Sequence, residues 1–430
     1  MRLLLLGHCS YYTIANLAVA IREYIPEINV TAADPLKPGG GSISQEEMKV
    51  FDEVIYLPMK RQIKISTADR LHSLAEIFKD KTKRSILLKN IFLLRFRSLM
   101  KQINSNAEEI IHSEKIRTIF SNFDIFHYHY LAPEYLYNVK YVPNGKKVVM
   151  TFWGSDLYQI AGTENYRKQL DSLERADIIT VNALEIKETL LAKFGRNLED
   201  KIRFSDFGLD KDKLKKLNAE NRVKFISDFR NKYKIQENKL VITVGYSGSS
   251  KQKHIEILNT LNTLDERYRK RMFVVIPMTY GLQFEEKGYA ETVKKVCNES
   301  GFETLILEKY MVDDELAAFT FSSDIKLNLR DTDALNAAML ESLFAGNIVI
   351  NGAWLPYGKL KRLGIYFREI EKLSGLKEIL PFLIDNFEDE KRKASGNAEI
   401  IRKNFLYDNL IFDWKEIYTG SDLTMNSNIY

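Results

Sequence analysis

The sequence has little that could hold a metal ion or form a disulfide framework. Its 430 residues include two cysteines, Cys9 and Cys297, which are far apart and have no metal-ligand spacing. Free thiols in a reducing compartment are the expected state of both. No Ser-His-Asp order, Cys-His nucleophile or His/Cys cluster stands out either. A triad hydrolase and a zinc protein are therefore not indicated.

Long apolar runs and a strong net charge are also absent. No stretch reaches the roughly 18 apolar residues that a membrane-spanning helix needs. The apolar start Met1–Gly7 is too short for a signal peptide, and no small-residue cleavage site follows it. The formal net charge of +5 is mild for this length and does not argue for a nucleic-acid partner. These absences predict a cytoplasmic protein.

The segment 81–101 is an exception to this even charge distribution. It carries seven Lys or Arg residues and no acidic residue, interleaved with Ile, Leu and Phe. A basic amphipathic segment of this kind can lie on an anionic membrane surface. It can equally be a surface helix whose long cations extend around a stripe that faces the core. Both interpretations stay open, and with them a peripheral position on the inner membrane face.

The chain is long enough for two domains. A length of 430 residues exceeds one ordinary core and suits two domains of about 200 residues. Short apolar runs alternate with helical patterns, which predicts an α/β fold with mostly parallel sheets. The expected strands are Arg2–Leu6, Val54–Leu57, Ile125–His129, Val148–Phe152 and Ile178–Asn182, then Leu240–Gly245, Met272–Pro277, Thr304–Leu307, Ile325–Leu329 and Ile348–Ile350.

The domain boundaries follow from this pattern. The charged segment Lys211–Lys234 marks a junction, so we predict a first domain at 1–210 and a second at 211–398. A helix at 399–420 and a frayed tail at 421–430 complete the chain. Two Rossmann-like domains that face each other leave a cleft at the carboxyl ends of their strands, where ligands of such sheets bind. The terminal helix is a candidate to cross back to the first domain.

The most informative stretch lies between Leu329 and Ile350. Asp333 stands where a helix N-cap belongs, because apolar periodicity starts after it and Gly346 marks the stop. A helix N-terminus is a natural seat for a diphosphate. Glu341 follows eight residues later, about 12 Å along a helix. The two carboxylates can bracket a nucleotide sugar; the alternative is a surface helix with an ordinary cap and a solvated Glu.

Asp333-x7-Glu341, ahead of Ser-Leu-Phe-Ala-Gly and a strand, resembles the acidic-x7-Glu signature of retaining family 4 glycosyltransferases. Asp takes the place of the commoner first Glu. Further stretches resemble that family in the expected order, and Trp153–Tyr158 with Pro277–Gly281 is similar to bacterial 4-acetamido-4,6-dideoxygalactose (Fuc4NAc) transferases that act on lipid-linked intermediates. The further stretches are Phe123–His129, Thr151–Asp156, Ala176–Ile179, Lys201–Asp210 and Val244–Lys251.

The resemblance implies a GT-B fold and gives roles to the donor-binding residues. Asp333 would contact the donor sugar, Glu341 the ribose and Lys251 the diphosphate. Tyr246 stands where the family has an Arg, so Arg330 or Lys253 is the candidate second cation. Such cations neutralise the charge that builds up on the leaving diphosphate. The other donor-binding candidates are Gly248, Tyr310, Met311, Leu335 and Asn336.

The first domain supplies fewer candidates. Asp156 is the best polar residue there, although a helix-capping Asp is the alternative. His8, after the first strand, and Trp153, which replaces the family's loop His, are expected on the acceptor side. A lone loop His is more often merely exposed. The predicted catalytic set is Asp333, Lys251, Arg330 and Asp156.

Asp331-Thr332-Asp333 also spells the DxD of metal-dependent glycosyltransferases with a single-domain fold. Here it comes late in the chain, at an expected helix start, so we interpret it as coincidental. No metal and no cofactor are expected, and the nucleotide sugar is a substrate. No G-x-G-x-x-G loop follows a strand, which counts against an NAD enzyme.

The sequence thus predicts a retaining, metal-independent glycosyltransferase of cell-surface polysaccharide biosynthesis. Its partners would be a nucleotide-sugar donor and a lipid-linked or polymeric glycan acceptor. The resemblance implies retention by a front-face mechanism. Two alternatives stay open: a catalytically inactive GT-B subunit that supports a partner transferase, and a nucleotide-sugar epimerase on the same fold.

Overall fold

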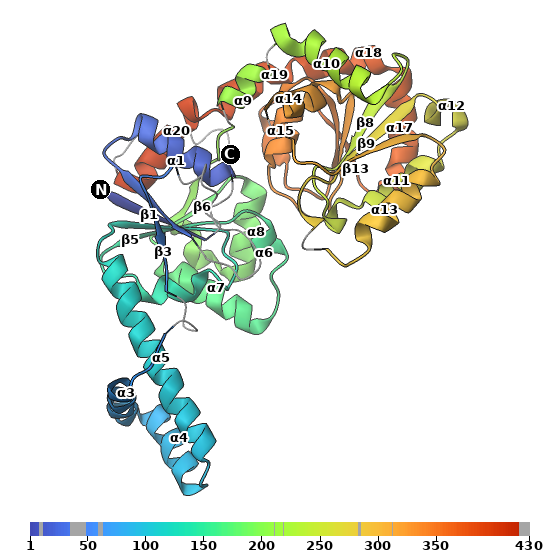
Figure 1. Ribbon diagram of the computed structural model, residues 1–430. Helices are drawn as coiled ribbons and strands as arrows, with labels where there is room; N and C mark the ends of the chain where they lie inside the picture. The colour runs from blue at the N-terminus through green and yellow to red at the C-terminus, as the bar shows by residue number, and fades with distance from the viewer. Residues whose placement is uncertain are drawn as a thin grey trace. The chain divides into compact units, whose positions relative to one another are not determined.

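The computed structural model describes residues 1–7, 12–34, 49–58, 63–209, 211–217, 219–282, 285–311 and 313–420 (Figure 1). Its contacts divide the chain into two compact units. The first unit holds residues 1–151 and 161–179, and the second holds 152–160 and 180–430. His8 and the predicted tail 421–430 lie outside the described residues. The domain boundary at residue 210 stays a prediction.

The first sheet has seven strands in the order β3-β2-β1-β4-β5-β6-β7. The neighbouring strands from β3 through β5 in this order all pair in parallel. Leu3 to Leu6 are buried, as expected for a parallel strand covered on both faces. The strands are β1 (Arg2–Gly7), β2 (Asn29–Asp34), β3 (Glu53–Tyr56), β4 (Ile125–His129), β5 (Lys147–Thr151), β6 (Ile178–Val181) and β7 (Ile202–Phe204).

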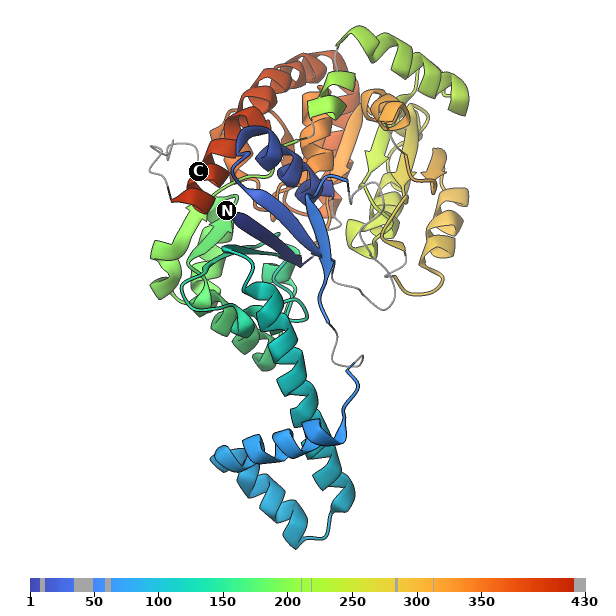
Figure 2. The same cartoon turned by 60° about the vertical axis from the view of Figure 1, so that its left-hand side comes forward.

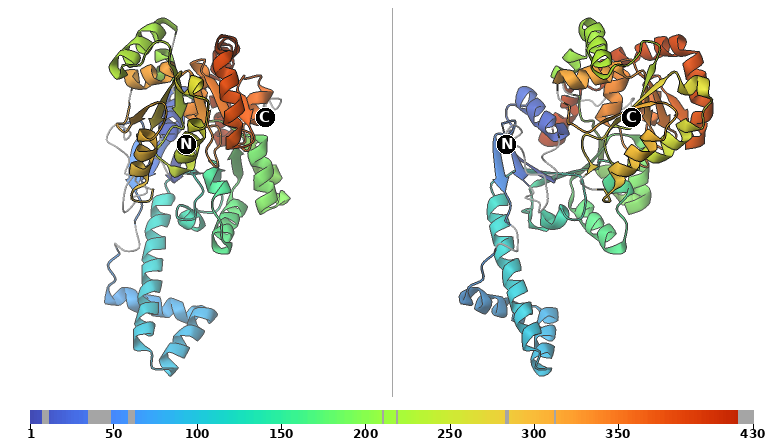
Figure 3. Two further views of the ribbon diagram at one scale, coloured as in Figure 1. Left: turned by 90° about the vertical axis from the view of Figure 1, so that its right-hand side faces the viewer. Right: turned by 45° about the vertical axis from the view of Figure 1, so that its right-hand side comes forward.

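The helices between these strands include three consecutive ones that project from the first unit. Figures 2 and 3 show α3, α4 and α5 extending away from the sheet, with the α4–α5 turn at the far end. The helices between the strands of this sheet are α1 (Tyr12–Tyr24), α3 (Thr67–Lys79), α4 (Lys81–Phe92), α5 (Phe96–Phe120), α6 (Ser155–Tyr158), α7 (Thr163–Arg175) and α8 (Leu184–Phe194).

The second sheet has six parallel strands in the order β10-β9-β8-β11-β12-β13. Renumbered from β8, this is the Rossmann order 3-2-1-4-5-6, whose switch point lies between β8 and β11. The strands are β8 (Leu240–Val244), β9 (Met272–Pro277), β10 (Glu303–Leu307), β11 (Ile325–Asn328), β12 (Ile348–Gly352) and β13 (Arg368–Ile370).

Helices cover both faces of this sheet, and the core is split accordingly. Val241 and Val275 pack in one cluster of buried residues, whereas their neighbours Ile242 and Val274 pack in another, because successive strand side chains point to opposite faces. The helices are α9 (Lys211–Lys216), α10 (Ala219–Tyr233), α11 (His254–Asn262), α12 (Glu266–Arg269), α13 (Tyr289–Asn298), α14 (Asp313–Ser322), α15 (Ala337–Phe344), α16 (Gly358–Arg362), α17 (Leu376–Asp385), α18 (Phe387–Ser395), α19 (Asn397–Asn404) and α20 (Tyr407–Thr419).

The predicted α/β class with two Rossmann-like parallel sheets is confirmed, and every predicted strand is present to within about two residues at each end. β2, β7 and β13 were not among the predicted strands. The single helix predicted at 399–420 is wrong. It is two helices, α19 and α20, that break where the Leu209 amide donates to the Phe405 carbonyl at 2.8 Å. Of the described helices, none is long and apolar enough to cross a membrane.

Candidate functional site

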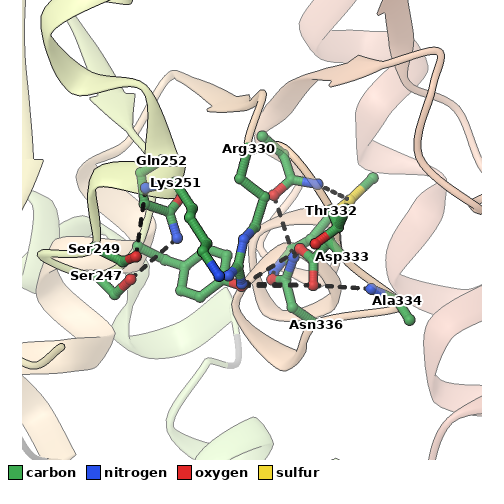
Figure 4. A network of polar contacts seen from close by, with 12 residues as sticks. Ser247, Ser249, Lys251, Gln252, Arg330, Thr332, Asp333, Ala334 and Asn336 are labelled. Carbon is green, nitrogen blue, oxygen red and sulfur yellow. Dashed lines mark hydrogen bonds and ion pairs between the residues drawn. The ribbon is translucent and has the colours of Figure 1, made fainter. Parts of the chain in front are cut away.

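Three loops meet at the switch point of the second sheet. They follow β8, β11 and β12, which are neighbours in the sheet, so their carboxyl ends share one edge. Ligands of open α/β sheets bind at such an edge. Figure 4 shows the polar network that these loops build around Asp333. All the residues of this network belong to the second unit.

Asp333 lies at the centre of the network and is buried. Its carboxylate accepts hydrogen bonds from the Ala334 amide at 2.9 Å, the Tyr357 hydroxyl at 3.1 Å and the Asn336 side-chain amide. The Arg330 guanidinium lies 3.9 Å away. Burial raises the pKa of Asp333, and the charge of Arg330 opposes that shift. A desolvated carboxylate held by several donors is suited to orient a polar ligand.

The prediction that Asp333 caps the following helix is wrong. Helix α15 begins at Ala337, and its N-cap is Asn336, whose side-chain oxygen accepts from the Met339 amide at 2.7 Å. Both Asp and Asn are favoured N-cap types, but the Asp333 carboxylate is bound by the Tyr357 hydroxyl instead. The acidic residue therefore lies in the loop before the helix rather than at its first turn.

Asn336 joins three parts of the site. Besides capping α15, its side-chain amide donates to the Tyr357 hydroxyl at 2.8 Å and to the Asn328 side chain at 3.2 Å. Asn328, at the end of β11, in turn donates to the side chain of Asn351 in β12 at 2.8 Å. Two strand ends and a helix start thus share one hydrogen-bonded cluster.

Arg330 takes a position that suits the expected second cation. Its guanidinium donates to the Tyr246 hydroxyl and lies 5.4 Å from the centre of that ring. Burial, and then the nearby Asp333 carboxylate, raise the pKa of Tyr246 well above its usual range. Tyr246 therefore stays neutral. The loop after β8, which carries no Arg at this position, holds the Arg supplied by the loop after β11.

The two lysines of the first loop have different surroundings. The Lys251 ammonium donates to the side-chain oxygen of Gln159. Lys253 pairs with Asp331 at 2.9 Å and lies 4.7 Å from the ring centre of Trp354. Asp331 and Asp333, the acidic ends of the DxD sequence, thus have separate partners, Lys253 and the buried network.

The remaining donor-binding candidates belong to the same unit. Glu341 is buried on α15. Leu335 has a left-handed backbone with φ of 50° and packs against a core cluster. A Cβ at Gly248 would lie 2.5 Å from Leu282 Cγ, so the close approach of the two loops needs a glycine. Tyr310 is exposed, and Met311, next to it, packs against the core.

Of the three candidates that precede β6 in the sequence, the structure describes Asp156 and Trp153. Asp156 is buried in the first turn of α6 and accepts from the Trp153 backbone amide at 2.8 Å. The N-cap of α6 is Gly154, without a side-chain cap hydrogen bond, so Asp156 is not the capping residue that the sequence offered as an alternative. Trp153 itself lies 5.5 Å from the ring centre of Phe207. His8 lies outside the described residues, so its predicted role is neither supported nor contradicted.

Two polar residues of the site were absent from the predicted set. Tyr357 is fully buried with its hydroxyl on Asp333, and Gln159 contacts both Lys251 and Thr332. Tyr357 follows β12, a neighbour of β11, so its place after a predicted strand was an available signal. Gln159 had no such signal, because its partners are far away in the sequence.

Comparison with models of protein families and with curated proteins finds no match. Solved structures do match over nearly the full length. HepE of Anabaena, in complex with UDP and glucose, superposes with a TM-score of 0.68 at 12% identity, covering 98% of this chain and 100% of that one. WaaG, a glycosyltransferase involved in lipopolysaccharide biosynthesis, gives 0.61 at 14% identity, covering 98% and 100%. Sucrose-phosphate synthase from Thermosynechococcus elongatus gives 0.63 at 12% identity, covering 97% and 98%. The chain therefore has the GT-B fold.

Proposed function

We propose that the chain is a retaining, metal-independent glycosyltransferase. It moves a sugar from a nucleotide-sugar donor to a lipid-linked or polymeric glycan acceptor, in cell-surface polysaccharide biosynthesis at the cytoplasmic membrane face. The observation that carries the proposal is the buried Asp333 carboxylate at the switch point, held by Asn336 and Tyr357 with Arg330 beside it. Support for the donor class comes from similar structures that hold UDP with glucose and UDP-glucose.

The donor would lie along the edge formed by the three loops. Asp333 would accept hydrogen bonds from the sugar hydroxyls, and Glu341 from the ribose. Lys251 and Arg330 would face the diphosphate, where fixed cations stabilise the charge that develops as it leaves. Lys253 is the weaker candidate for a phosphate contact, because it already pairs with Asp331. Backbone groups near Tyr310 and Met311 would contact the base, and Asp156 with Trp153 would border the acceptor.

Retention follows from the front-face step that the family resemblance implies. The bond between the anomeric carbon and the phosphate oxygen breaks, and a bond to the acceptor oxygen forms on the same face. The leaving phosphate oxygen takes the proton of the acceptor hydroxyl, so no side chain is needed as the base. The anomeric configuration of the product, read by NMR, tests this point.

The first test is thermal unfolding with UDP, GDP, dTDP or CDP, each with and without EDTA. A ligand at 100 times its dissociation constant stabilises the folded state by about 2.7 kcal/mol. Stabilisation by one nucleotide regardless of EDTA is the expected result. Loss of that stabilisation with EDTA would contradict metal independence, and stabilisation by none of them would contradict donor binding.

The second test compares Asp333→Asn with Asp331→Asn under turnover conditions. The two carboxylates are two residues apart, but Asp331 pairs with Lys253 and its side chain is 55% exposed. We expect turnover to fall at least about a hundredfold for Asp333→Asn and to change little for the control. Equal losses would point to a DxD metal site instead. Nucleotide binding without turnover favours the inactive subunit, and donor conversion without acceptor favours an epimerase.

A further inference from the structure

The helices α3, α4 and α5 form a helical arm of the first unit, residues 67–120, and polar contacts tie the three helices together. The Ser73 hydroxyl donates to the Ile103 carbonyl at 2.8 Å, and the Asn106 side chain accepts from Lys83 at 2.8 Å. Farther along, Asn90 and Gln102 bond at 3.2 Å. The first contact joins α3 to α5, and the other two join α4 to α5 at two places. The turn between the two helices is therefore held at the end of a defined hairpin.

This turn exposes a continuous set of apolar side chains, which we call the apex, residues 91–96. Phe92 is 86% exposed, Leu94 73% and Phe96 66%, and Ile91 and Leu93 are exposed as well. The helices behind the apex add Ile86, Leu88 and Met100 to the exposed surface. Single exposed apolar residues are ordinary, but a contiguous group of this size marks an interaction surface.

The backbone conformation of Leu94 is a second indication that the apex has a role other than stabilising the fold. It follows the C-cap Leu93 and has a left-handed backbone with φ of 53°. The Arg95 amide closes the turn by donating to the Asn90 carbonyl at 2.9 Å. Glycine is the favoured residue at this position, since a side chain there is strained. The chain thus keeps a large apolar side chain in solvent at a position where glycine would fold with less strain.

The charge around the apex indicates what it contacts. All seven Lys and Arg residues of segment 81–101 are exposed, and the segment has no acidic residue. Among the described residues, none of the seven forms an ion pair. Lys89, Arg95 and Arg97 flank the apolar side chains directly. Apolar groups flanked by exposed cations match an anionic lipid surface, where the rings enter the acyl boundary and the cations reach the headgroup phosphates.

We propose that the apex inserts into an anionic lipid bilayer, with Lys89, Arg95 and Arg97 on the lipid phosphates. This differs from the single segment lying flat on a membrane that the sequence suggested, because 81–101 is a helix hairpin broken at residues 93–95. The proposal concerns the first unit alone. It can therefore hold or fail independently of the donor site on the second unit.

The test is co-sedimentation of the full chain with vesicles of phosphatidylcholine, alone or mixed with phosphatidylglycerol, at low and high salt. We expect binding only to the mixed vesicles and weaker binding at high salt. Phe92→Ser combined with Phe96→Ser should lower the partition coefficient at least about tenfold. Lys89→Gln with Arg97→Gln should lower it about fivefold per charge. Leu71→Ser and Lys115→Gln, at exposed positions of the arm outside the apex, should leave it unchanged.

Leu94→Gly keeps the proposal testable even if other variants misfold, because glycine suits the left-handed position. It should unfold at the same or a higher temperature and still bind vesicles more weakly. Wild-type vesicle binding that is absent, or equal in the apex and control variants, overturns the proposal. Self-association that disappears in the apex variants, without vesicle binding, would overturn it in favour of a second copy of this chain. Nucleotide-induced stabilisation serves as the separate readout of the donor site and should be unaffected in every variant.

Discussion

Removing the hydroxyl of Tyr357 is the sharpest perturbation of the network around Asp333. That hydroxyl donates to Asp333 at 3.1 Å and accepts from the backbone and side chain of Asn336 at 3.1 and 2.8 Å. Tyr357 is fully buried, so water does not readily replace it. A hydrogen bond to a charged group contributes about 1.5–3 kcal/mol, and a neutral one about 1 kcal/mol. Because Asn336 keeps its contacts with Asp333 and Asn328, we expect Tyr357→Phe to lower the free energy of unfolding by about 3 kcal/mol.

The assay is urea unfolding of the full chain, paired with binding of the nucleotide and of the matching nucleotide sugar. Affinity for the nucleotide sugar should fall more than affinity for the nucleotide, because Asp333 loses a donor that fixes its orientation. Tyr56→Phe is the control, since Tyr56 is 49% exposed and the same deletion there should change stability by less than about 0.5 kcal/mol. Equal stability of the Tyr357 and Tyr56 variants would refute the view that this hydroxyl supports the site.

Three further predictions concern other buried polar groups of the second unit. Glu341→Gln should weaken binding of the nucleotide and its sugar equally, with the unfolding temperature nearly unchanged; unaltered affinity would contradict the ribose contact. Burial lowers the pKa of His254 from 6.5 to about 4. Below pH 6.5 the unfolded chain therefore takes up a proton that the folded chain does not, and the free energy of unfolding falls. Between about pH 7 and pH 5 the free energy of unfolding should fall by about 2 kcal/mol. Urea unfolding at the two pH values measures this fall, which should be absent in His254→Asn. An equal fall in the wild type and the variant would contradict the role of His254. Lys359→Met should lower the free energy of unfolding by about 3–5 kcal/mol, because it leaves the buried carboxylate of Asp206 without its cation. Adding Asp206→Leu should recover most of that loss. If the losses of the two single variants simply add in the double variant, the two side chains are not coupled.

The sheets could be predicted because their strands are buried on both faces and read as continuous apolar runs. The breaks in the helices could not. Leu94 is no helix breaker by composition, yet the hairpin turns there because α4 and α5 pack through Asn90 and Gln102. Likewise Phe405 and Leu406 carry no stop signal, and the chain breaks there because Leu209 pairs with this segment.

The candidate site shows the same division. The sequence contains the acidic pair, the cations and the loops that carry them, since each follows a recognisable strand. It does not say which of Asp333 and Asn336 starts the helix, because both are good N-cap types. Tertiary contacts decide: the hydroxyl of Tyr357, 24 residues away in sequence, binds Asp333, and Asn336 is left to cap α15. Pairing of Tyr246 with Arg330 is equally invisible to spacing.

The double role of Asn336 has a consequence for heat sensitivity. The first turn of a helix frays at lower temperature than the core melts, and the residue that ends this fraying in α15 is the one that holds the Asp333 carboxylate. Each opening of that turn therefore also removes one donor from the carboxylate, which keeps only those of Ala334 and Tyr357. We therefore expect warming to loosen the ligand geometry at this edge before the second sheet itself melts.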